Sequence, residues 1–350
     1  MRALVTGATG FMGGRLTERL LERGDSVRVL ARRPEAAARL VALGASVTQG
    51  DLTDVASLER AVADVDVVFH CAGLSVDWAP HAEFERVNVD GAIAMARAAA
   101  HAKVSRFVHV SSTDVYGYPV VPCGDDGPTL DVGLPYNSSK LRGELGVRAV
   151  AAETGLSLTV IRPGTVWGPR AKDWGVEMSK LLATKDMMVV AGGHVAGGLV
   201  FIDNLIDALV EAATRDEAKG RIYTVRDESK DTWRAYLDAL ADGLKLPRVS
   251  LSLPLWFALA LGAVSEFFWK LVRAKSRPLV TRHAVYVLGR DQSYGIARAV
   301  AELGFTSRVS FAEGMQQTIA WLDSPEGRAA RDVKLSPHSE APVPPSPRRS

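Results

Sequence analysis

Short apolar runs alternate with amphipathic stretches through the first half of the chain, and this alternation strongly limits the folds open to it. The apolar runs predict strands at 2–7, 26–32, 45–51, 66–73, 106–112 and 156–164. The stretches between them predict helices at 11–23, 34–43, 54–63, 82–101 and 136–153. Strands that alternate with helices form a parallel sheet covered on both faces. We therefore predict an α/β fold with a Rossmann-type, doubly wound parallel sheet.

The second half of the chain is less regular and predicts a smaller, mainly helical lobe. We expect residues 1–165 to form an NADP-binding domain, to which residues 199–225 return as strand, helix and strand. Residues 166–198 and 226–323 would form the substrate-binding lobe. The last stretch, 324–350, is rich in proline and serine and has few large apolar side chains, so we predict a disordered tail.

Composition excludes several classes of protein. Hydrophobic residues make up 47% and charged residues 23% of the 350 positions, which is typical of a globular protein. The formal net charge is only +2, which does not indicate a nucleic-acid-binding protein. Cys71 and Cys123 are 52 positions apart, which is not the spacing of metal ligands, so we predict no metal site. Two such cysteines are expected to be free thiols in a reducing cytoplasm. Met1 runs directly into an apolar strand without room for a signal peptide, so we expect a cytoplasmic location.

The first predicted strand runs into a glycine-rich turn, "TGATGFMGG", at which an amphipathic helix begins. Glycine lets the backbone turn sharply and approach a pyrophosphate closely, while the free N–H groups of the helix start face the phosphates. The alternative is a plain turn between strand and helix. We predict a dinucleotide cradle made of Gly7, Thr9, Gly10, Phe11, Met12 and Gly13.

The end of the second strand bears on which dinucleotide is bound. NAD-binding folds usually place an acidic residue there, on the ribose 2′-hydroxyl. This sequence has Ala31, Arg32 and Arg33 instead. Two guanidinium groups suit a 2′-phosphate by charge and by bidentate hydrogen bonding, so we predict NADP rather than NAD. A solvated arginine pair is the alternative.

The motif T-G-A-T-G-F-M-G resembles that of the extended short-chain dehydrogenase/reductase family, and the similarity runs through most of residues 1–323. In that family an Asp-Leu pair meets the adenine, a small-residue strand end lies beside the cofactor, and R-P-x-x-V-Y-G-P flanks the nicotinamide. "GDLTD", "HCAG" and "RPGTVWGP" are similar to these three motifs. The cofactor-binding residues that the resemblance implies are Asp51, Leu52, Cys71, Ala72, Gly73 and Pro163.

Tyr136 and Lys140 match the Y-x-x-x-K motif of the same family, and a spacing of four places both on one helical face. A free tyrosine titrates near pH 10, and a nearby ammonium group lowers that pKa, so we expect Lys140 to activate Tyr136. The resemblance implies that Lys140 also binds the nicotinamide ribose and that Ser112 binds the substrate oxygen, with Ser111 and Thr113 as alternatives. In the other interpretation these serines only cap a strand end.

Other polar residues receive structural interpretations. Asn88 matches an asparagine that supports the catalytic helix in the family, and a capping or exposed asparagine is the alternative. His70 and His109 lie on inner strands, so we expect satisfied core residues. Asp203 and Asn204 stand where a helix begins, and we interpret them as its N-cap.

Residues 253–277 form the most distinctive stretch of the second half. No residue from 249 to 265 is charged, and Lys270, Arg273, Lys275 and Arg277 follow. Pro254 and Glu266 leave the apolar run too short to span a membrane. Three interpretations stay open: a buried helix, which is the most ordinary, a wall of an apolar substrate pocket, and an in-plane membrane contact.

This stretch and the residues after it resemble the 3β-hydroxysteroid dehydrogenase branch of the family, which implies a steroid-like or long-chain β-keto or β-hydroxy substrate. We predict an NADP-dependent oxidoreductase that interconverts a hydroxyl and a ketone through Ser112, Tyr136 and Lys140. A nucleotide-sugar epimerase or dehydratase and a non-catalytic NADP-binding regulatory protein are the alternatives. Analogy with the family also implies a homodimer.

Overall fold

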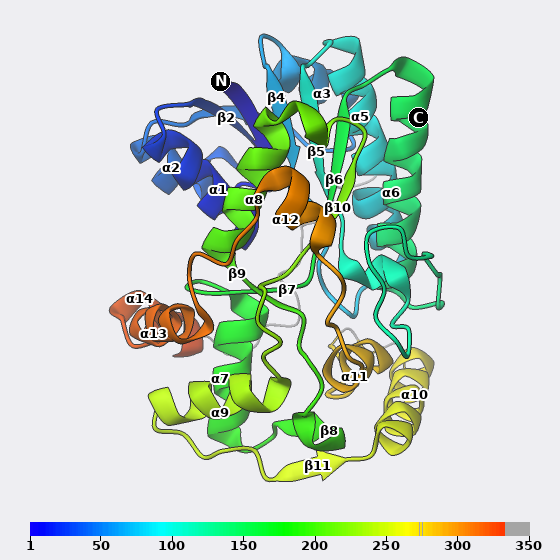
Figure 1. The fold of residues 1–350 in the computed structure, drawn as a ribbon, viewed down its shortest axis with the longest axis vertical. Helices are drawn as coiled ribbons and strands as arrows, with labels where there is room; N and C mark the ends of the chain where they lie inside the picture. The colour runs from blue at the N-terminus through cyan, green and yellow to red at the C-terminus, as the bar shows by residue number, and fades with distance from the viewer. Residues whose placement is uncertain (273, 275, 333–350) are drawn as a thin grey trace, which may run out of the picture.

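The computed structural model describes residues 1–272, 274 and 276–332, and it is built around one parallel sheet (Figure 1). The seven strands lie in the order β10-β6-β5-β4-β1-β2-β3, and every neighbouring pair runs parallel. Their bounds are β1 Arg2–Thr6, β2 Ser26–Ala31, β3 Ser46–Gln49, β4 Val67–His70, β5 Arg106–Val110, β6 Leu158–Pro163 and β10 Ile222–Val225. The direction of winding changes between β1 and β4, which is the Rossmann arrangement.

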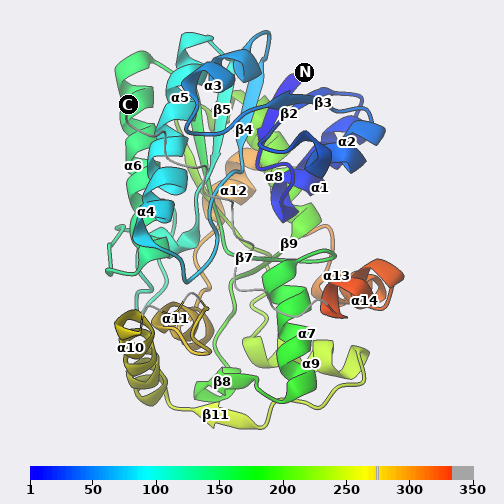
Figure 2. The ribbon, with the colours of Figure 1, turned by 180° about the vertical axis from the view of Figure 1, so that it is seen from behind.

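Helices cover both faces of the sheet, as Figures 1 and 2 show from opposite sides. One face carries α3 Val55–Val62, α5 Gly91–His101 and α6 Pro135–Thr154. The other carries α1 Phe11–Glu22, α2 Ala38–Ala42, α8 Ile202–Thr214 and α12 Ala297–Leu303. Every residue of β4, β5 and β6 is buried, as expected for strands covered on both sides. The predicted doubly wound fold is confirmed.

The helix predicted over 82–101 is divided in the structure. It consists of α4 His81–Phe84, a π-helical segment at Glu85–Asp90, and α5. The π segment contains Asn88, which is buried and whose Nδ2 donates to Ser139 Oγ on α6 (3.0 Å) and to the Leu74 carbonyl (3.1 Å). Asn88 Oδ1 accepts from the Leu74 backbone N–H (2.7 Å). Asn88 thus supports α6, as the family resemblance implied, and is not an exposed residue.

The second lobe is mainly helical and lies below the sheet in Figure 1. Two short parallel pairs brace it, β7 Thr165–Trp167 with β9 Leu199–Phe201 and β8 Met188–Val190 with β11 Leu251–Leu253. Of residues 199–225, only β10 therefore joins the main sheet. The division into domains stays a prediction. The helices of this lobe are α7 Met178–Thr184, α9 Trp233–Gly243, α10 Leu255–Leu271, α11 Arg282–Gly289 and α13 Phe311–Leu322.

Helix α10 is not the buried helix that we considered most ordinary. Only Ala258, Gly262 and Glu266 are buried along it, because this narrow face packs against α11, where Glu266 pairs with Arg282 (2.9 Å). A Cβ on Gly262 would lie 3.0 Å from the Arg282 nitrogen, so the two helices approach closely. The opposite face is exposed, with Trp256 at 72% of its full accessibility. Arg273 and Lys275, two of the basic residues noted after this helix, lie outside the described residues.

The prediction of a disordered tail from residue 324 is wrong for its first part. Residues Pro325–Asp332 form helix α14. The Trp321 indole donates to Glu326 (3.2 Å), and Arg170 pairs with the same carboxylate (3.5 Å). Gly327 is buried against Leu322 of α13, since a small residue lets the two helices touch. Residues 333–350 of the predicted tail lie outside the described residues.

Candidate active site

The glycine-rich turn after β1 is shaped for a phosphate group. Gly7 has a left-handed backbone (φ +70°), and a Cβ there would lie 2.7 Å from the Ala72 nitrogen. A Cβ on Gly13 would collide with the Gly7 carbonyl. Gly10 is the N-cap of α1 and offers no side chain to its N–H groups, and no acidic residue lies in the first turn. This uncapped helix start fits the pyrophosphate of a dinucleotide. Thr9 is exposed beside it, and Phe11 and Met12 are half-buried.

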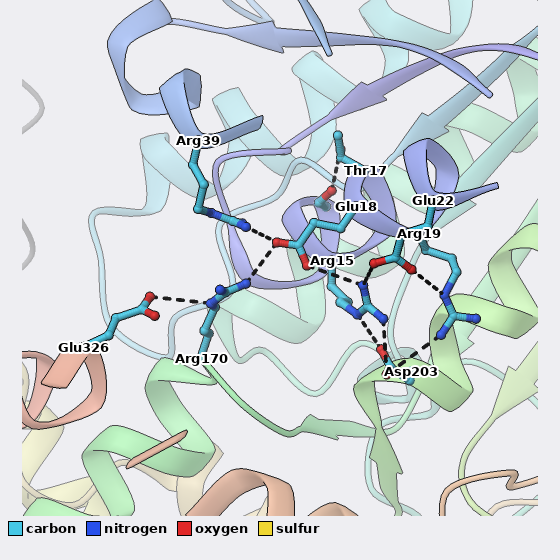
Figure 3. Close-up of polar contacts among 10 residues, drawn as sticks. Arg15, Thr17, Glu18, Arg19, Glu22, Arg39, Arg170, Asp203 and Glu326 are labelled. Atoms are coloured by element: carbon cyan, nitrogen blue, oxygen red, sulfur yellow. Dashed lines mark hydrogen bonds and ion pairs between the residues drawn. The ribbon is translucent and has the colours of Figure 1, made fainter. Parts of the chain in front are cut away.

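Ion pairs fix the helix that carries this cradle (Figure 3). Arg15 Nε binds Asp203 Oδ1 of α8 at 2.6 Å. Glu18 pairs with Arg39 of α2 and with Nη1 of Arg170, the latter at 2.9 Å. Because these partners come from α2, α8 and the segment after β7, the network holds α1 against three other parts of the chain.

The interpretation of Asp203 and Asn204 as an N-cap is wrong. The N-cap residue of α8 is Phe201, and no side chain caps it. Asp203 pairs with Arg15, and the Asn204 amide donates to Asp227 Oδ1 at 2.7 Å. Both residues therefore tie α8 to other elements.

The residues predicted to bind the ribose and adenine follow β2 and β3. Arg32 and Arg33 are both exposed, and Arg32 Nε lies 4.0 Å from Asp51 Oδ2. Asp51 Oδ1 accepts hydrogen bonds from the Thr53 backbone (2.9 Å) and hydroxyl (2.8 Å), and Leu52 beside it is half-buried. The carboxyl ends of parallel strands meet at one edge, so these groups share the edge with the glycine cradle.

The strand ends of β4 and β6 complete the predicted cofactor edge. The Ala72 N–H donates to Thr6 Oγ1 at 3.2 Å, and a Cβ on Gly73 would lie 3.9 Å from Lys140 Nζ. Burial raises the pKa of the Cys71 thiol to about 12, so Cys71 is a packing residue at neutral pH. Pro163, the last residue of β6, is buried.

The three predicted catalytic residues lie together at the end of β5. Ser112 follows β5, and its Oγ accepts a hydrogen bond from the Asp114 N–H (3.1 Å). Its hydroxyl lies near enough to Tyr136 to lower the pKa of the phenol. Tyr136 and Lys140 stand one turn apart near the start of α6, and Lys140 Nζ donates to the Val110 carbonyl at 2.7 Å. Ser111 is instead bonded to a buried carboxylate, that of Glu144 (2.7 Å). The catalytic roles stay predictions.

The pKa of Tyr136 moves opposite to our expectation. Burial raises the pKa of the phenol well above its ordinary value, and the Asp114 and Asp173 carboxylates raise it further, although the Ser112 hydroxyl lowers it. Burial also lowers the pKa of Lys140 to about 8. The protein by itself therefore keeps Tyr136 protonated at neutral pH.

Two residues near Tyr136 were missed by the sequence analysis. His283 of α11 has its Nε2 2.7 Å from Asp114 Oδ2, and its ring lies edge-on to that of Tyr136 with centroids 5.5 Å apart. Tyr118 donates to the same Asp114 oxygen at 2.7 Å. Asp114 and His283 are 169 positions apart in sequence, so no local pattern links them.

His70 and His109 are buried core residues, as predicted, but within the described residues neither is fully satisfied, since His70 Nε2 also lacks a hydrogen-bond partner. Their rings stack with centroids 5.6 Å apart, and His70 Nδ1 is bonded to Thr6 Oγ1 (2.9 Å). Within the described part of the chain, neither ring nitrogen of His109 has a hydrogen-bond partner. Burial, followed by the Lys140 charge, lowers the pKa of His70 to about 3, and the same causes lower the pKa of His109.

These two histidines predict a loss of stability in mild acid. Below pH 6.5 an unfolded histidine binds a proton, whereas folded His70 stays neutral until about pH 3. The unfolded state thus gains protons as the pH falls, so stability is full above pH 6.5 and decreases below it. Each histidine should cost about 1.4 kcal/mol per pH unit there. The free energy of unfolding, measured with urea between pH 7.5 and 5, should fall less steeply with decreasing pH in His109→Phe than in the wild type. The control His101→Phe, at an exposed position, should show the same pH dependence as the wild type. Equal slopes in all three proteins would contradict this account.

Over residues 1–272, 274 and 276–332, no group of three or more histidine, cysteine, aspartate or glutamate side chains could hold a metal ion.

Comparison with known proteins agrees with this architecture. A sequence model of the NAD dependent epimerase/dehydratase family matches residues 3–225. A 4-hydroxy-2-methyl-3-oxo-4-farnesyl-3,4-dihydroquinoline-1-oxide ketoreductase from Stigmatella aurantiaca is 31% identical over 318 residues, covering 90% of this chain and 95% of the relative.

Two further relatives extend along most of the chain. A 2-alkyl-3-oxoalkanoate reductase from Stenotrophomonas maltophilia is 28% identical and covers 91% of this chain and 98% of its own length. A 3-beta-hydroxysteroid dehydrogenase from Mycolicibacterium neoaurum is 28% identical, with 91% of both chains covered.

A solved structure shares the fold. MoeE5 in complex with UDP-glucose and NAD superposes with a TM-score of 0.72 at 24% identity, covering 92% of this chain and 98% of that one. The sequence resemblance to extended short-chain dehydrogenases, and to their 3β-hydroxysteroid dehydrogenase branch, is confirmed. The chain belongs to the NAD dependent epimerase/dehydratase family.

Proposed function

We propose that this protein is an NADP-dependent oxidoreductase that interconverts a hydroxyl and a ketone on an apolar substrate, either steroid-like or a long-chain β-keto or β-hydroxy compound. The observation that carries the proposal is the gathering of Ser112, Tyr136 and Lys140 at the end of β5, on the same sheet edge as the glycine cradle. The family and the reductase and dehydrogenase relatives support an enzyme acting on CH–OH groups.

Each side chain has a distinct task in this proposal. NADP, held by the glycine cradle, would supply the hydride in reduction and accept it in oxidation. Ser112 polarises the substrate oxygen, and Tyr136 donates the proton to that oxygen during reduction. Tyr136 holds its proton at neutral pH, because burial raises the pKa of the phenol, so the proton that reduction requires is present. Lys140, whose Nζ lies close to Gly73 at the cofactor edge, orients the nicotinamide ribose.

The direct test follows NADPH absorbance with the purified protein and a panel of 3-oxosteroids and long-chain β-keto acids. NADPH consumption that depends on one of these ketones is the expected result. The panel includes nucleotide sugars, because the family name and the UDP-glucose complex of MoeE5 favour an epimerase or dehydratase as the second candidate. Conversion of a nucleotide sugar without net loss of NADPH would replace the oxidoreductase proposal. Binding of NADPH without any turnover would instead support a regulatory protein.

The choice of NADP over NAD rests on Arg32 and Arg33. Both are exposed at the end of β2, where a 2′-phosphate would lie. Because a hydrogen bond to a charged group contributes about 1.5–3 kcal/mol, replacing both with alanine should raise the KM for NADPH roughly 10- to 100-fold. The KM for NADH should change little, and Arg97→Ala on the far face of α5 is the control. An unchanged preference for NADPH would contradict the assignment.

We also propose that α10 lies in the plane of a membrane surface. Its outer face exposes Trp256, Phe257, Phe267 and Leu271, and Lys270 follows near its end. Over the described residues, no helix is both long and apolar enough to cross a bilayer. The protein should co-sediment with anionic vesicles, and Trp256→Asp with Phe267→Asp should abolish this without loss of ketone reduction. Equal sedimentation of both proteins would contradict the contact. The homodimer and the cytoplasmic location stay predictions.

A further inference from the structure

A histidine from the second lobe reaches the catalytic tyrosine. His283 lies in the first turn of α11, and its side chain is largely buried, with 17% exposed. One ring nitrogen, Nε2, contacts Asp114 Oδ2 at 2.7 Å, and the ring stands at 79° to that of Tyr136. His283 is thus in contact with the Asp114 carboxylate and the Tyr136 phenol at the same time.

The Asp114 carboxylate is held on several sides. Its Oδ2 accepts from the Tyr118 hydroxyl and from His283, each at 2.7 Å. Its backbone N–H donates to Ser112 Oγ (3.1 Å), and its carbonyl accepts from Asn137 (2.7 Å). These contacts fix a negative charge beside Tyr136, where it raises the pKa of the phenol. A cation that pairs with Asp114 would offset that effect.

The charges around His283 favour its imidazolium form. Burial lowers the pKa of His283, but the hydrogen bond and the charge of Asp114 raise it by more, and Asp77 adds to this. Arg277 opposes it, yet this guanidinium is itself paired with Asp77 at 2.6 Å. The rings of Tyr118 and Tyr136 both stand edge-on to the His283 ring. Asp173 is a further carboxylate of this region, and it raises the pKa of Tyr136.

We propose that His283 is a positioning residue for Tyr136: its ring edge holds the phenol in place, and its positive charge neutralises Asp114. This inference rests on the proposed function, because it assigns a tuning role at the same site. Its consequence is that the second lobe contributes a residue to the proton chemistry of the site. Without His283, the unpaired Asp114 charge would make Tyr136 a poorer proton donor and delay its ionisation to higher pH.

A set of variants separates this role from simple packing. His283→Phe keeps an aromatic ring against Tyr136 but loses the hydrogen bond and the charge. Asp114→Asn removes the charge that His283 neutralises, and the double variant lacks both. The measurement is the pH dependence of kcat/KM for oxidation of the hydroxyl substrate, in which Tyr136 acts as the base.

We expect His283→Phe to lower kcat/KM for oxidation about tenfold at pH 7. The rising limb of the plot of kcat/KM against pH should move to higher pH by about one unit. Adding Asp114→Asn should return the limb close to its wild-type position, because the charge that His283 neutralised is then absent, while Asp173 acts equally in all the variants. A loss of activity without a shifted limb, or a shift that Asp114→Asn fails to reverse, would overturn the proposal and leave His283 a packing residue.

A second measurement does not depend on turnover. The His283 ring resonance, assigned by its loss in His283→Phe, should titrate above pH 6.5 in the wild type and at lower pH in Asp114→Asn. In the wild type, the chemical shift of the Tyr136 ring, assigned through Tyr136→Phe, should change with pH at the same midpoint as that of His283. If no substrate is turned over but this coupling is seen, the proposed reaction fails while the pairing stands. If the Tyr136 resonance ignores the His283 titration, the positioning role is refuted whatever the activity.

Discussion

Replacement of Tyr136 by phenylalanine is expected to lower kcat for ketone reduction by about 10³-fold, within the range that a positioned acid contributes. The phenol hydroxyl is the group that our proposal assigns to proton donation, and Ser112, which the proposal places on the substrate oxygen, lies near enough to affect the pKa of that phenol. Phenylalanine keeps the ring and its edge contact with His283, so the fold and cofactor binding should survive. NADPH absorbance gives the rate, and quenching of protein fluorescence gives the cofactor affinity.

Tyr223→Phe is the matched control for this variant. Tyr223 is also a buried tyrosine with a hydrogen-bonded hydroxyl, but its partner is Glu302 (2.7 Å), and it lies on the outermost strand β10. Its removal should leave kcat close to that of the wild type. If Tyr136→Phe retained most of the activity, another group would have to supply the proton, and the Ser112-Tyr136-Lys140 assignment would be withdrawn.

Replacement of Glu144 by alanine is expected to lower the free energy of unfolding by about 3–5 kcal/mol, the usual cost of breaking a buried ion pair. Glu144 is fully buried on α6 and pairs with Arg162, which is 2% exposed on β6. Arg162 Nε donates to Glu144 Oε2 at 3.0 Å, and Ser111 donates to the same oxygen at 2.7 Å. Burial opposes the charge of Arg162, and its hydrogen bonds with Glu144 overcome this and raise its pKa. Alanine would leave that guanidinium buried without its carboxylate.

Glu153→Ala on the same helix provides the control. Glu153 pairs with Arg97 at 3.3 Å, but both side chains are at least half exposed, and such pairs contribute about 0–1 kcal/mol. Urea unfolding of the two variants at pH 7.5 gives the comparison. A similar small loss in both would mean that Arg162 finds another partner or water once Glu144 is gone.

The parallel topology explains why so much of the candidate site was accessible from the sequence. Each predicted site residue lies in a short motif next to a strand end or on the helix that follows, as in "TGATGFMGG" after β1 and "SSTD" after β5. A parallel sheet brings all those ends to one edge, so local patterns were enough to predict which residues gather there. The same locality explains the errors. The sequence places Lys140 one turn from Tyr136, yet burial and Asp114, neither visible in that spacing, decide the direction of the Tyr136 pKa.

The sequence by itself determined the doubly wound sheet, the glycine cradle and the placement of Ser112, Tyr136 and Lys140, because alternating hydrophobicity and motif spacing are local properties of the chain. Only the tertiary structure decided which face of α10 is covered, how α14 packs, and that His283 meets Asp114 beside Tyr136. The contact between His283 and Asp114 joins segments 169 positions apart, whereas α10 and α14 pack against the neighbouring helices α11 and α13. The energies of all three come from burial and charge pairing, which exist only once the chain has folded.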